Sequence, residues 1–187
     1  MKKLFLILIV SVALSQVAFA QGEMRIGGAA NLALPFGDLG DVGSSVGFGV
    51  TGLFVYSFSD VIDFTGTLGW MTFGGESTEF PGYKAEYTVS TIPILFGVRY
   101  YIQKPSSGPQ WHVGGEAGFH RWSVDTKITS DNPFVNNFSG GVGSSTEFDL
   151  GAAGGFTSGN LDISAVFFFI NTQYIGIRAG YTVPLGN

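Results

Sequence analysis

The sequence predicts an all-β fold, namely an eight-stranded antiparallel up-and-down transmembrane β-barrel. The main observation is a recurring segment of about ten residues that alternates apolar with small or polar side chains and ends in a turn-forming cluster. Composition agrees with this, because aromatic residues make up 15% of the chain and charged residues only 12%. Beyond the first twenty residues no apolar run reaches the roughly 18 residues of a membrane-spanning helix, which excludes a helical membrane protein.

The N-terminal residues have the features of a secretory signal peptide. Lys2 and Lys3 precede the apolar stretch LFLILIVSVAL, and the small-residue motif AFA ends at Ala20. We expect cleavage to remove residues 1–20 and residues 21–187 to form one outer-membrane barrel domain. A membrane-anchoring helix is the alternative, and it is disfavoured because the apolar run is short and is interrupted by serine.

Charge and cysteine content exclude several classes of function. Removal of the two N-terminal lysines leaves seven basic and fourteen acidic residues, a net charge of −7. An acidic chain is a poor ligand for nucleic acid, which requires a basic face. Cysteine is absent, so the chain has no disulfide framework, thiolate metal site or cysteine nucleophile.

The eight predicted strands cover about 24–33, 46–58, 61–73, 92–101, 110–122, 146–156, 161–170 and 175–183. In the first four, one face carries the apolar set Met24, Ile26, Ala30, Leu32, Val46, Phe48, Val50, Phe54, Tyr56, Phe58, Ile62, Phe64, Leu68, Trp70, Ile92, Ile94, Phe96, Val98 and Tyr100. The opposite face carries Arg25, Ala29, Asn31, Gly47, Gly49, Thr51, Leu53, Val55, Ser57, Asp63, Thr65, Thr67, Gly69, Pro93, Leu95, Gly97, Arg99 and Tyr101. Because successive side chains of a strand point to opposite faces, each segment is two-sided.

The last four predicted strands show the same division. Their apolar face carries Trp111, Val113, Ala117, Phe119, Phe148, Leu150, Ala152, Phe156, Leu161, Ile163, Ala165, Phe167, Phe169, Ile175, Ile177, Ala179, Tyr181 and Val183. The opposite face carries His112, Gly114, Glu116, Gly118, His120, Glu147, Asp149, Gly151, Ala153, Asp162, Ser164, Val166, Phe168, Gly176, Arg178, Gly180 and Thr182.

The composition of the two faces decides between a membrane barrel and a soluble one. The less apolar face is rich in small residues, which suits a narrow, filled lumen better than a water-exposed surface. Large aromatic side chains lie near the segment ends on the apolar face, at Trp70, Tyr100, Trp111 and Phe169. These positions are typical of the aromatic girdles of membrane barrels, so we expect the apolar face to meet lipid.

The lengths of the connections give an orientation. Short turns follow the second, fourth and sixth segments, whereas long polar loops follow the first, third and fifth: LPFGDLGDVGSS, GGESTEFPGYKA and VDTKITSDNPFVNNFSGGVGS. Outer-membrane barrels have short periplasmic turns and longer extracellular loops, so we expect the chain to start on the periplasmic side.

Eight charged residues are predicted to face the lumen. They are Arg25, Asp63, Arg99, Glu116, Glu147, Asp149, Asp162 and Arg178. Because a buried unpaired charge is costly, we expect these side chains to pair in a network that fills the barrel. A proton or ion path through these groups, or an anion site at the arginines, is the functional alternative.

Other polar residues give weaker signals. His112 and His120 share the lumen face, and the sequence provides no third histidine or cysteine to complete a zinc site, so we predict no metal, cofactor or catalytic residue. Arg121 falls on the lipid face near an outer strand end, where we expect it to contact lipopolysaccharide phosphates. Pro93 lacks a backbone donor, so we expect a bulge there or a position near the outer end of its strand.

The segments IPILFGVRYY, WHVGGEAGFH, STEFDLGAAGGF and YIGIRAGYTV together resemble the small bacterial outer-membrane β-barrel family that includes the OmpA N-terminal domain, OmpX and OmpW. The resemblance implies the cell outer membrane of a diderm bacterium, with outer-membrane lipid and the barrel assembly machinery as partners. Family members typically end in an aromatic assembly signal, whereas this chain ends YTVPLGN, which moves the signal back to Tyr181 or changes its recognition. Barrels of this size that act on lipid A carry a lipid-facing His and Ser two residues apart, and this pattern is missing, so we do not expect an enzyme.

Three functions remain in competition at this point. The first is a barrel with a charge-filled lumen and a structural or surface-interaction role, whose extracellular loops meet a ligand or partner. The second is a narrow passage for small or hydrophobic solutes, as the resemblance to OmpW implies. The third is a soluble secreted lipid-binding barrel, in which the apolar face would point inward.

Overall fold

The computed structural model describes residues 22–41, 45–103, 108–130, 138–171 and 173–186. The predicted signal peptide and its cleavage site lie outside these residues. The described elements are β1 (Met24–Pro35), α2 (Gly37–Asp41), β2 (Gly47–Ser57), β3 (Ile62–Phe80), β4 (Tyr83–Gln103), β5 (Gln110–Ser130), β6 (Phe138–Ser158), β7 (Leu161–Phe168) and β8 (Tyr174–Pro184). None of the described helices is long and apolar enough to cross a membrane.

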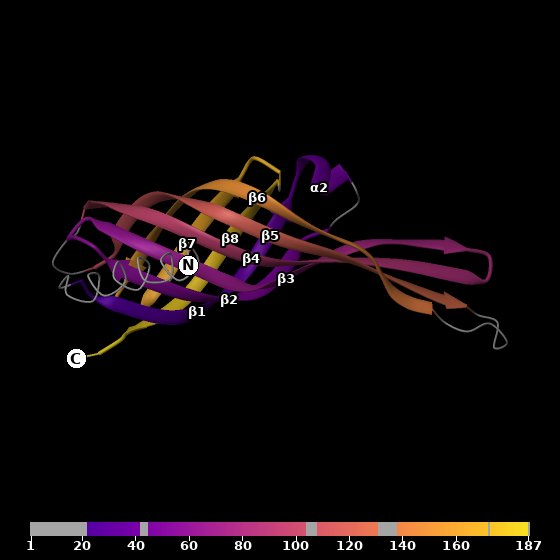
Figure 1. Cartoon of the computed structure of the whole chain (residues 1–187), viewed down its shortest axis with the longest axis horizontal. Helices are drawn as coiled ribbons and strands as arrows, with labels where there is room; N and C mark the ends of the chain where they lie inside the picture. The colour runs from indigo at the N-terminus through magenta and orange to yellow at the C-terminus, as the bar shows by residue number, and fades with distance from the viewer. Residues whose placement is uncertain (1–21, 42–44, 104–107, 131–137, 172, 187) are drawn as a thin grey trace, which may run out of the picture.

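The strands form a closed antiparallel barrel in sequence order, from β1 to β8 (Figure 1). Each strand pairs with its neighbours in the chain, and β8 returns to β1, where Ala30 lies opposite Ala179. Closure gives every strand of the cylinder a partner on both sides, which a bilayer requires because it offers no water to unpaired backbone groups. The predicted eight-stranded up-and-down barrel is confirmed.

The two faces of the strands point as the alternation predicts. Phe96 of β4 is 71% exposed on the outside of the barrel, whereas Arg99 of the same strand is only 4% exposed and points into the lumen. Phe167 is likewise exposed on the outside of the barrel, and Asp149 is likewise buried inside it. This arrangement contradicts the soluble lipid-binding barrel, in which the apolar side chains would be inside. One member of the predicted outer set differs, because Tyr56 is buried near the end of β2.

Two predicted loops are instead long β-hairpins. β3 continues to Phe80 and β4 begins at Tyr83, with only a two-residue turn between them, and Gly82 of that turn has a φ of 83°. β5 and β6 extend in the same direction, so that four strands project beyond the cylinder (Figure 1). The prediction was wrong because a strand with both faces in water carries polar side chains on each face, so these segments lack the apolar alternation that marks the other strands. The predicted loop after the fifth segment lies partly outside the described residues.

Pro93 does not occupy the bulge or strand end that was predicted. It lies in the middle of β4, and the register between β3 and β4 is the same on both sides of it. The pairing is interrupted instead, because no ladder pairs join Gly69 and Trp70 of β3 to Ile92 and Pro93. Proline has no N–H group to donate, so the sheet tolerates it here by losing ladder contacts locally.

The outer half of the lumen is filled by apolar side chains, which we call the apolar plug. The plug consists of Ala33, Met71, Phe73, Leu95, Trp122, Val166, Phe168 and Tyr174. Leu39 of α2 packs against it from the outer end of the barrel. The remaining half of the lumen, towards the short turns and the start of β1, carries most of the charged residues and contains the candidate site.

Candidate functional site in the barrel lumen

The first ion pair lies near the short-turn end and joins opposite walls of the barrel. Arg99 of β4 contacts Asp162 of β7 through its Nη1 and the carboxylate Oδ2, and Nη2 donates to Oδ1 at 3.4 Å. Both side chains are almost fully buried. The strand register places Arg99 directly opposite Asp63 of β3, yet its guanidinium crosses the lumen to β7. The pair therefore ties together two strands that do not touch in the sheet.

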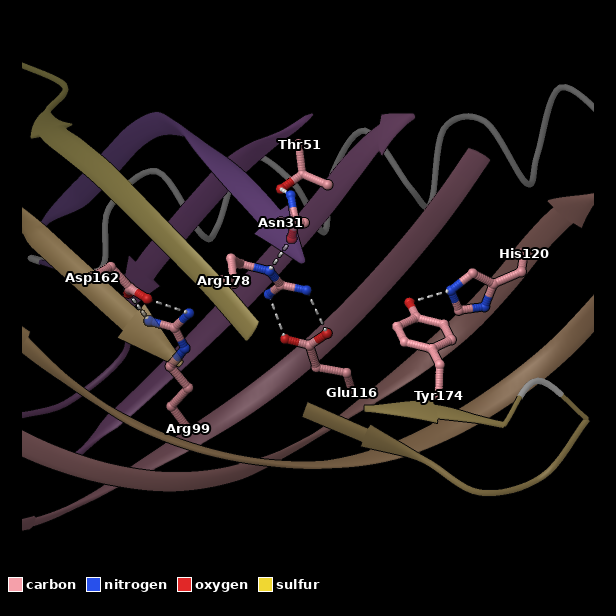
Figure 2. Close-up of polar contacts among 8 residues, drawn as sticks. All are labelled: Asn31, Thr51, Arg99, Glu116, His120, Asp162, Tyr174 and Arg178. Carbon is pink, nitrogen blue, oxygen red and sulfur yellow. Dashed lines mark hydrogen bonds and ion pairs between the residues drawn. The ribbon is translucent and has the colours of Figure 1, made fainter. Parts of the chain in front are cut away.

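A second ion pair lies in the middle of the lumen (Figure 2). Arg178 of β8 donates from Nη1 to Glu116 Oε1 at 2.8 Å and from Nη2 to Glu116 Oε2 at 3.2 Å. Its Nε donates to Asn31 Oδ1 at 3.3 Å, and the Asn31 amide donates to Thr51 Oγ1 at 3.0 Å. Two parallel hydrogen bonds join the planar guanidinium to the carboxylate. Such bidentate pairs are among the strongest charged hydrogen bonds in proteins. The chain of contacts spans four strands.

A third group lies next to the apolar plug. His120 Nδ1 is 2.7 Å from Asp149 Oδ2, and His120 Nε2 is 3.0 Å from the Tyr174 hydroxyl (Figure 2 shows the latter contact). Asp149 also accepts a hydrogen bond of 3.1 Å from the backbone N–H of Asn171, which follows β7. All three side chains are buried, and the His120 ring packs edge-on against Phe168. These contacts join the polar lumen to the connection between β7 and β8.

The remaining predicted lumen charges are placed less tightly. Asp63 accepts a hydrogen bond of 2.8 Å from the Tyr101 hydroxyl. Arg25 donates from Nη2 to the carbonyl oxygens of Gly159 at 2.7 Å and Thr182 at 3.3 Å. Neither side chain has a close ionic partner of opposite sign among the described residues, since Arg25 approaches a carboxylate only at 4.0 Å, at Glu23.

Glu147 and Arg121 lie towards the outer end of the barrel and do not join the lumen pairs. Glu147 is opposite His120 in the register, is half-buried and accepts a hydrogen bond of 3.3 Å from Ser145 Oγ. Arg121 is exposed on the lipid-facing side between Ile92 and Thr146, as predicted from the alternation.

The alternation identified the lumen face but not the polar residues that complete its contacts. Asn31, Thr51 and Tyr101 belong to the predicted lumen face, although nothing local in the sequence marks them as partners of charges. Tyr174 was assigned to no face because it stands at the first position of β8. His112 is buried in the same lumen, and neither of its ring nitrogens has a hydrogen-bond partner among the described residues. Within the part of the chain that the structure describes, no three His, Cys, Asp or Glu side chains are arranged to hold a metal ion.

Comparison with known proteins assigns the chain to a family. Residues 4–152 match the sequence model of the family described as outer membrane protein beta-barrel domain. The chain belongs to this family. It is therefore an outer-membrane β-barrel protein, in agreement with the predicted resemblance. A search of curated protein sequences finds no significant match.

Three solved structures that are similar to this chain have little sequence identity to it. Neisserial surface protein A, NspA, is 16% identical over 87% of this chain and 97% of that chain, with a TM-score of 0.54. The attachment invasion locus protein Ail of Yersinia pestis is 17% identical over 87% of this chain and 97% of that chain, with a TM-score of 0.47. The N-terminal β-barrel domain of Pseudomonas aeruginosa OprF is 14% identical over 87% of this chain and all of that chain, with a TM-score of 0.42. At this level of identity, the NspA structure supports the fold alone.

Proposed function

We propose that the protein is a closed outer-membrane barrel that acts at the cell surface through its projecting hairpins. The observation that carries this proposal is the four-stranded sheet formed by the outer parts of β3 to β6, which continues well beyond the cylinder (Figure 1). A barrel that served only to span the membrane would need strands of about ten residues, whereas β4, β5 and β6 each have 21. The additional length has its use outside the membrane.

The edges of the projecting sheet are suited to contact another chain. Beyond Gly74, no described strand pairs with β3 on its β2 side. Before Leu150, no described strand pairs with β6 on its β7 side. Edge strands present N–H and C=O groups to which an extended segment of a partner can add. We therefore propose an extracellular protein or peptide as the class of partner.

The fillings of the lumen support a closed barrel over a narrow passage. Eight strands leave an interior only just wide enough for side chains. In this barrel one half of that interior is occupied by ion pairs and the other half by the apolar plug. A solute would have to separate the bidentate pair of Arg178 and Glu116 and also displace buried rings. We propose no reaction and no cofactor for this lumen.

Two measurements test the closed barrel and its orientation. Purified protein in planar lipid bilayers should give no steady single-channel steps, and regular steps would favour the narrow passage instead. Since the chain lacks cysteine, single cysteines can be introduced on a clean background. A membrane-impermeant maleimide should label T88C in the projecting sheet of intact cells and should fail to label S59C in the turn between β2 and β3. Labelling of S59C alone would reverse the orientation.

We further propose that Arg121 contacts lipopolysaccharide phosphates. The side chain is exposed on the lipid-facing surface near the level at which β2 begins and β7 ends. Arginine is well suited to phosphate because its guanidinium donates two parallel hydrogen bonds. R121A should weaken lipopolysaccharide binding to the purified barrel in native mass spectrometry, and R121K should retain part of it. Equal binding by all three proteins would contradict the contact.

The location also includes a processing step. We propose that residues 1–20 are removed and that the mature chain begins at Gln21. Intact-mass measurement of protein from the outer-membrane fraction tests this directly, because retention of residues 1–20 would give the mass of the full chain.

A further inference from the structure

A polar cavity lies at the short-turn end of the lumen and has no part in the surface role. Its volume is about 150 Å³. Since a water molecule occupies about 30 Å³ in the liquid, the cavity has room for about five waters or an organic solute of similar size. It is lined mainly by polar and charged side chains, among them Arg25, Ser57, Asp63, Arg99 and Asp162.

Asp63 is the carboxylate of this cavity that lacks a cation. Asp63 is only 3% exposed, and its Oδ2 accepts the hydrogen bond from Tyr101, but its Oδ1 is buried and has no hydrogen-bond partner among the residues that the structure describes. The nearest cation in the register, Arg99, is used by Asp162 on the far wall. A buried carboxylate oxygen without a donor is costly, so the geometry favours a positively charged donor at this position.

Arg25 presents the opposite deficiency on the other side of the cavity. Its Nη2 donates to backbone carbonyl oxygens and to Asn160 Oδ1, and its Nη1 lies 4.0 Å from Glu23 Oε1, but its Nε–H is buried and has no acceptor within the described part of the chain. Arg25 is opposite Val55 on β2, and Asp63 is opposite Ser57 on the same strand. The two residues are therefore two strand spacings apart and offset by two residues along the strands, roughly 12 Å between backbones, and both line the same cavity.

We propose that this cavity binds a small zwitterion of the amino-acid type from the periplasm. The ammonium group of the solute pairs with the Asp63 carboxylate and its carboxylate pairs with the Arg25 guanidinium, which requires both side chains to turn Oδ1 and Nε–H, buried from water-sized groups in the structure, towards the cavity. An amine alone satisfies only Asp63, and an anion alone satisfies only Arg25. A metal ion is disfavoured because no described group of three His, Cys, Asp or Glu side chains converges there.

The apolar plug makes this cavity a binding site and not the entrance to a passage. The plug fills the outer half of the lumen, and the ion pair of Arg178 and Glu116 lies between the two regions. A solute that enters from the periplasmic end therefore leaves by the same end. The site is thus independent of the hairpins, and shortening them leaves it unchanged.

Titration calorimetry on the refolded barrel in detergent micelles tests the proposal with glycine, ethylammonium and acetate as probes. Glycine should bind about tenfold more tightly than either one-ended probe, because one additional charged hydrogen bond contributes at least about 1.4 kcal/mol, a factor of ten. D63N should abolish the binding of ethylammonium and weaken glycine binding about tenfold, to the affinity of acetate. R25K, which loses the Nε–H donor and retains the charge, should weaken glycine binding about tenfold and leave ethylammonium unaffected. E147Q removes a lumen-face carboxylate far from the cavity and should bind glycine as the wild type does.

The folding of each variant is checked by the mobility difference between heated and unheated samples on a gel. If D63N does not fold, wild-type NMR gives the answer, since glycine should shift the resonances of the Asp63 carboxyl carbon and the Arg25 Nε–H. Absence of glycine binding to the wild type would show that the cavity holds water only and would overturn the proposal. Two other results would also overturn the proposal: glycine binding to D63N as tight as to the wild type, or equal affinities of the wild type for glycine and ethylammonium.

Discussion

The two halves of the lumen are filled in opposite ways. Towards the short turns the interior is held by ion pairs that reach across the barrel, such as Arg99 with Asp162. Towards the outer end it is held by the rings of Phe73, Trp122 and Phe168. The barrel thus contains a polar interior and a small hydrophobic core along one axis. The comparison shows that the same alternating strand pattern can supply either type of filling. Alternation determines which side chains point into the lumen, but it does not determine whether those side chains are charged or apolar.

The two fillings respond differently to substitution. A buried ion pair adds little net stability, because desolvation of both charges offsets their attraction, but loss of one partner leaves an uncompensated charge. Loss of a buried ring removes transfer free energy and leaves a cavity. The first kind of damage should therefore be repaired by removing the second partner, whereas the second kind should not.

The largest effect is expected in the polar half. E116A leaves the Arg178 guanidinium buried without its bidentate carboxylate, and the free energy of unfolding should fall by about 4 kcal/mol. Urea unfolding of the barrel in lipid vesicles, followed by tryptophan fluorescence, measures this change. The double variant E116L/R178L should recover most of the loss. A double variant as unstable as E116A would show that the cost is a packing effect and not an unpaired charge.

The next effect concerns the apolar plug. F168A removes a fully buried ring that contacts His120 and Tyr174, so the free energy of unfolding should fall by about 3 kcal/mol. The matched control is F96A, the same substitution on the lipid-facing side, where Phe96 is 71% exposed and no cavity forms. The same urea experiment should show a clearly smaller loss for F96A. Equal losses would mean that the outer half of the lumen is not packed as a core.

A smaller effect is expected at the boundary between the two halves. Y174F retains the ring of Tyr174 in the plug and removes only the hydroxyl that lies 3.0 Å from His120 Nε2. The free energy of unfolding should fall by about 1 kcal/mol, the typical contribution of one hydrogen bond. A loss as large as that of F168A would indicate that the hydroxyl supports more of the lumen than this single contact. NMR of the His120 ring provides a local measurement of the same change.

The faces of the strands could be predicted from the sequence, but the pairing of the charges could not. Alternation is a local property, and lipid requires an apolar outer face, so Phe96 and Arg99 were assigned to opposite sides correctly. The partner of Arg99 depends on how the closed barrel brings β7 opposite β4. The register alone would pair Arg99 with Asp63, whereas the guanidinium reaches Asp162. Contacts across a lumen are set by closure, and closure leaves no local signal.

The hairpins and the plug were missed for related physical reasons. Polar strands in water and polar loops share one composition, and only the pairing of β3 with β4 beyond Gly74 distinguishes them. Trp122 stands at the end of a predicted strand, and its inward position depends on the continuation of β5 to Ser130. Because the predicted fifth strand was too short, Trp122 was not recognised as part of the apolar plug.

The smallest effect is expected in the projecting sheet, which has neither filling. Lys84 Nζ lies 2.7 Å from Glu86 Oε1 on the projecting part of β4, and both side chains are partly exposed. The hydrogen bond from Lys84, followed by its charge, holds the pKa of Glu86 below its ordinary value, and the same contact raises the pKa of Lys84. K84A should therefore raise the pKa of Glu86 in an NMR pH titration and leave the urea midpoint unchanged, because exposed ion pairs contribute little.

The direction of the pH dependence follows from the lowered pKa of Glu86. The contribution of the pair is complete above the ordinary pKa of glutamate and is lost as the pH falls through the lowered value of the folded state. In the wild type the resonances of the hairpin should follow this change. A shift of Arg178 or Glu116 resonances in K84A would mean that the projecting sheet and the lumen are coupled, and the separation between a sealed interior and an independent outer sheet would then be wrong.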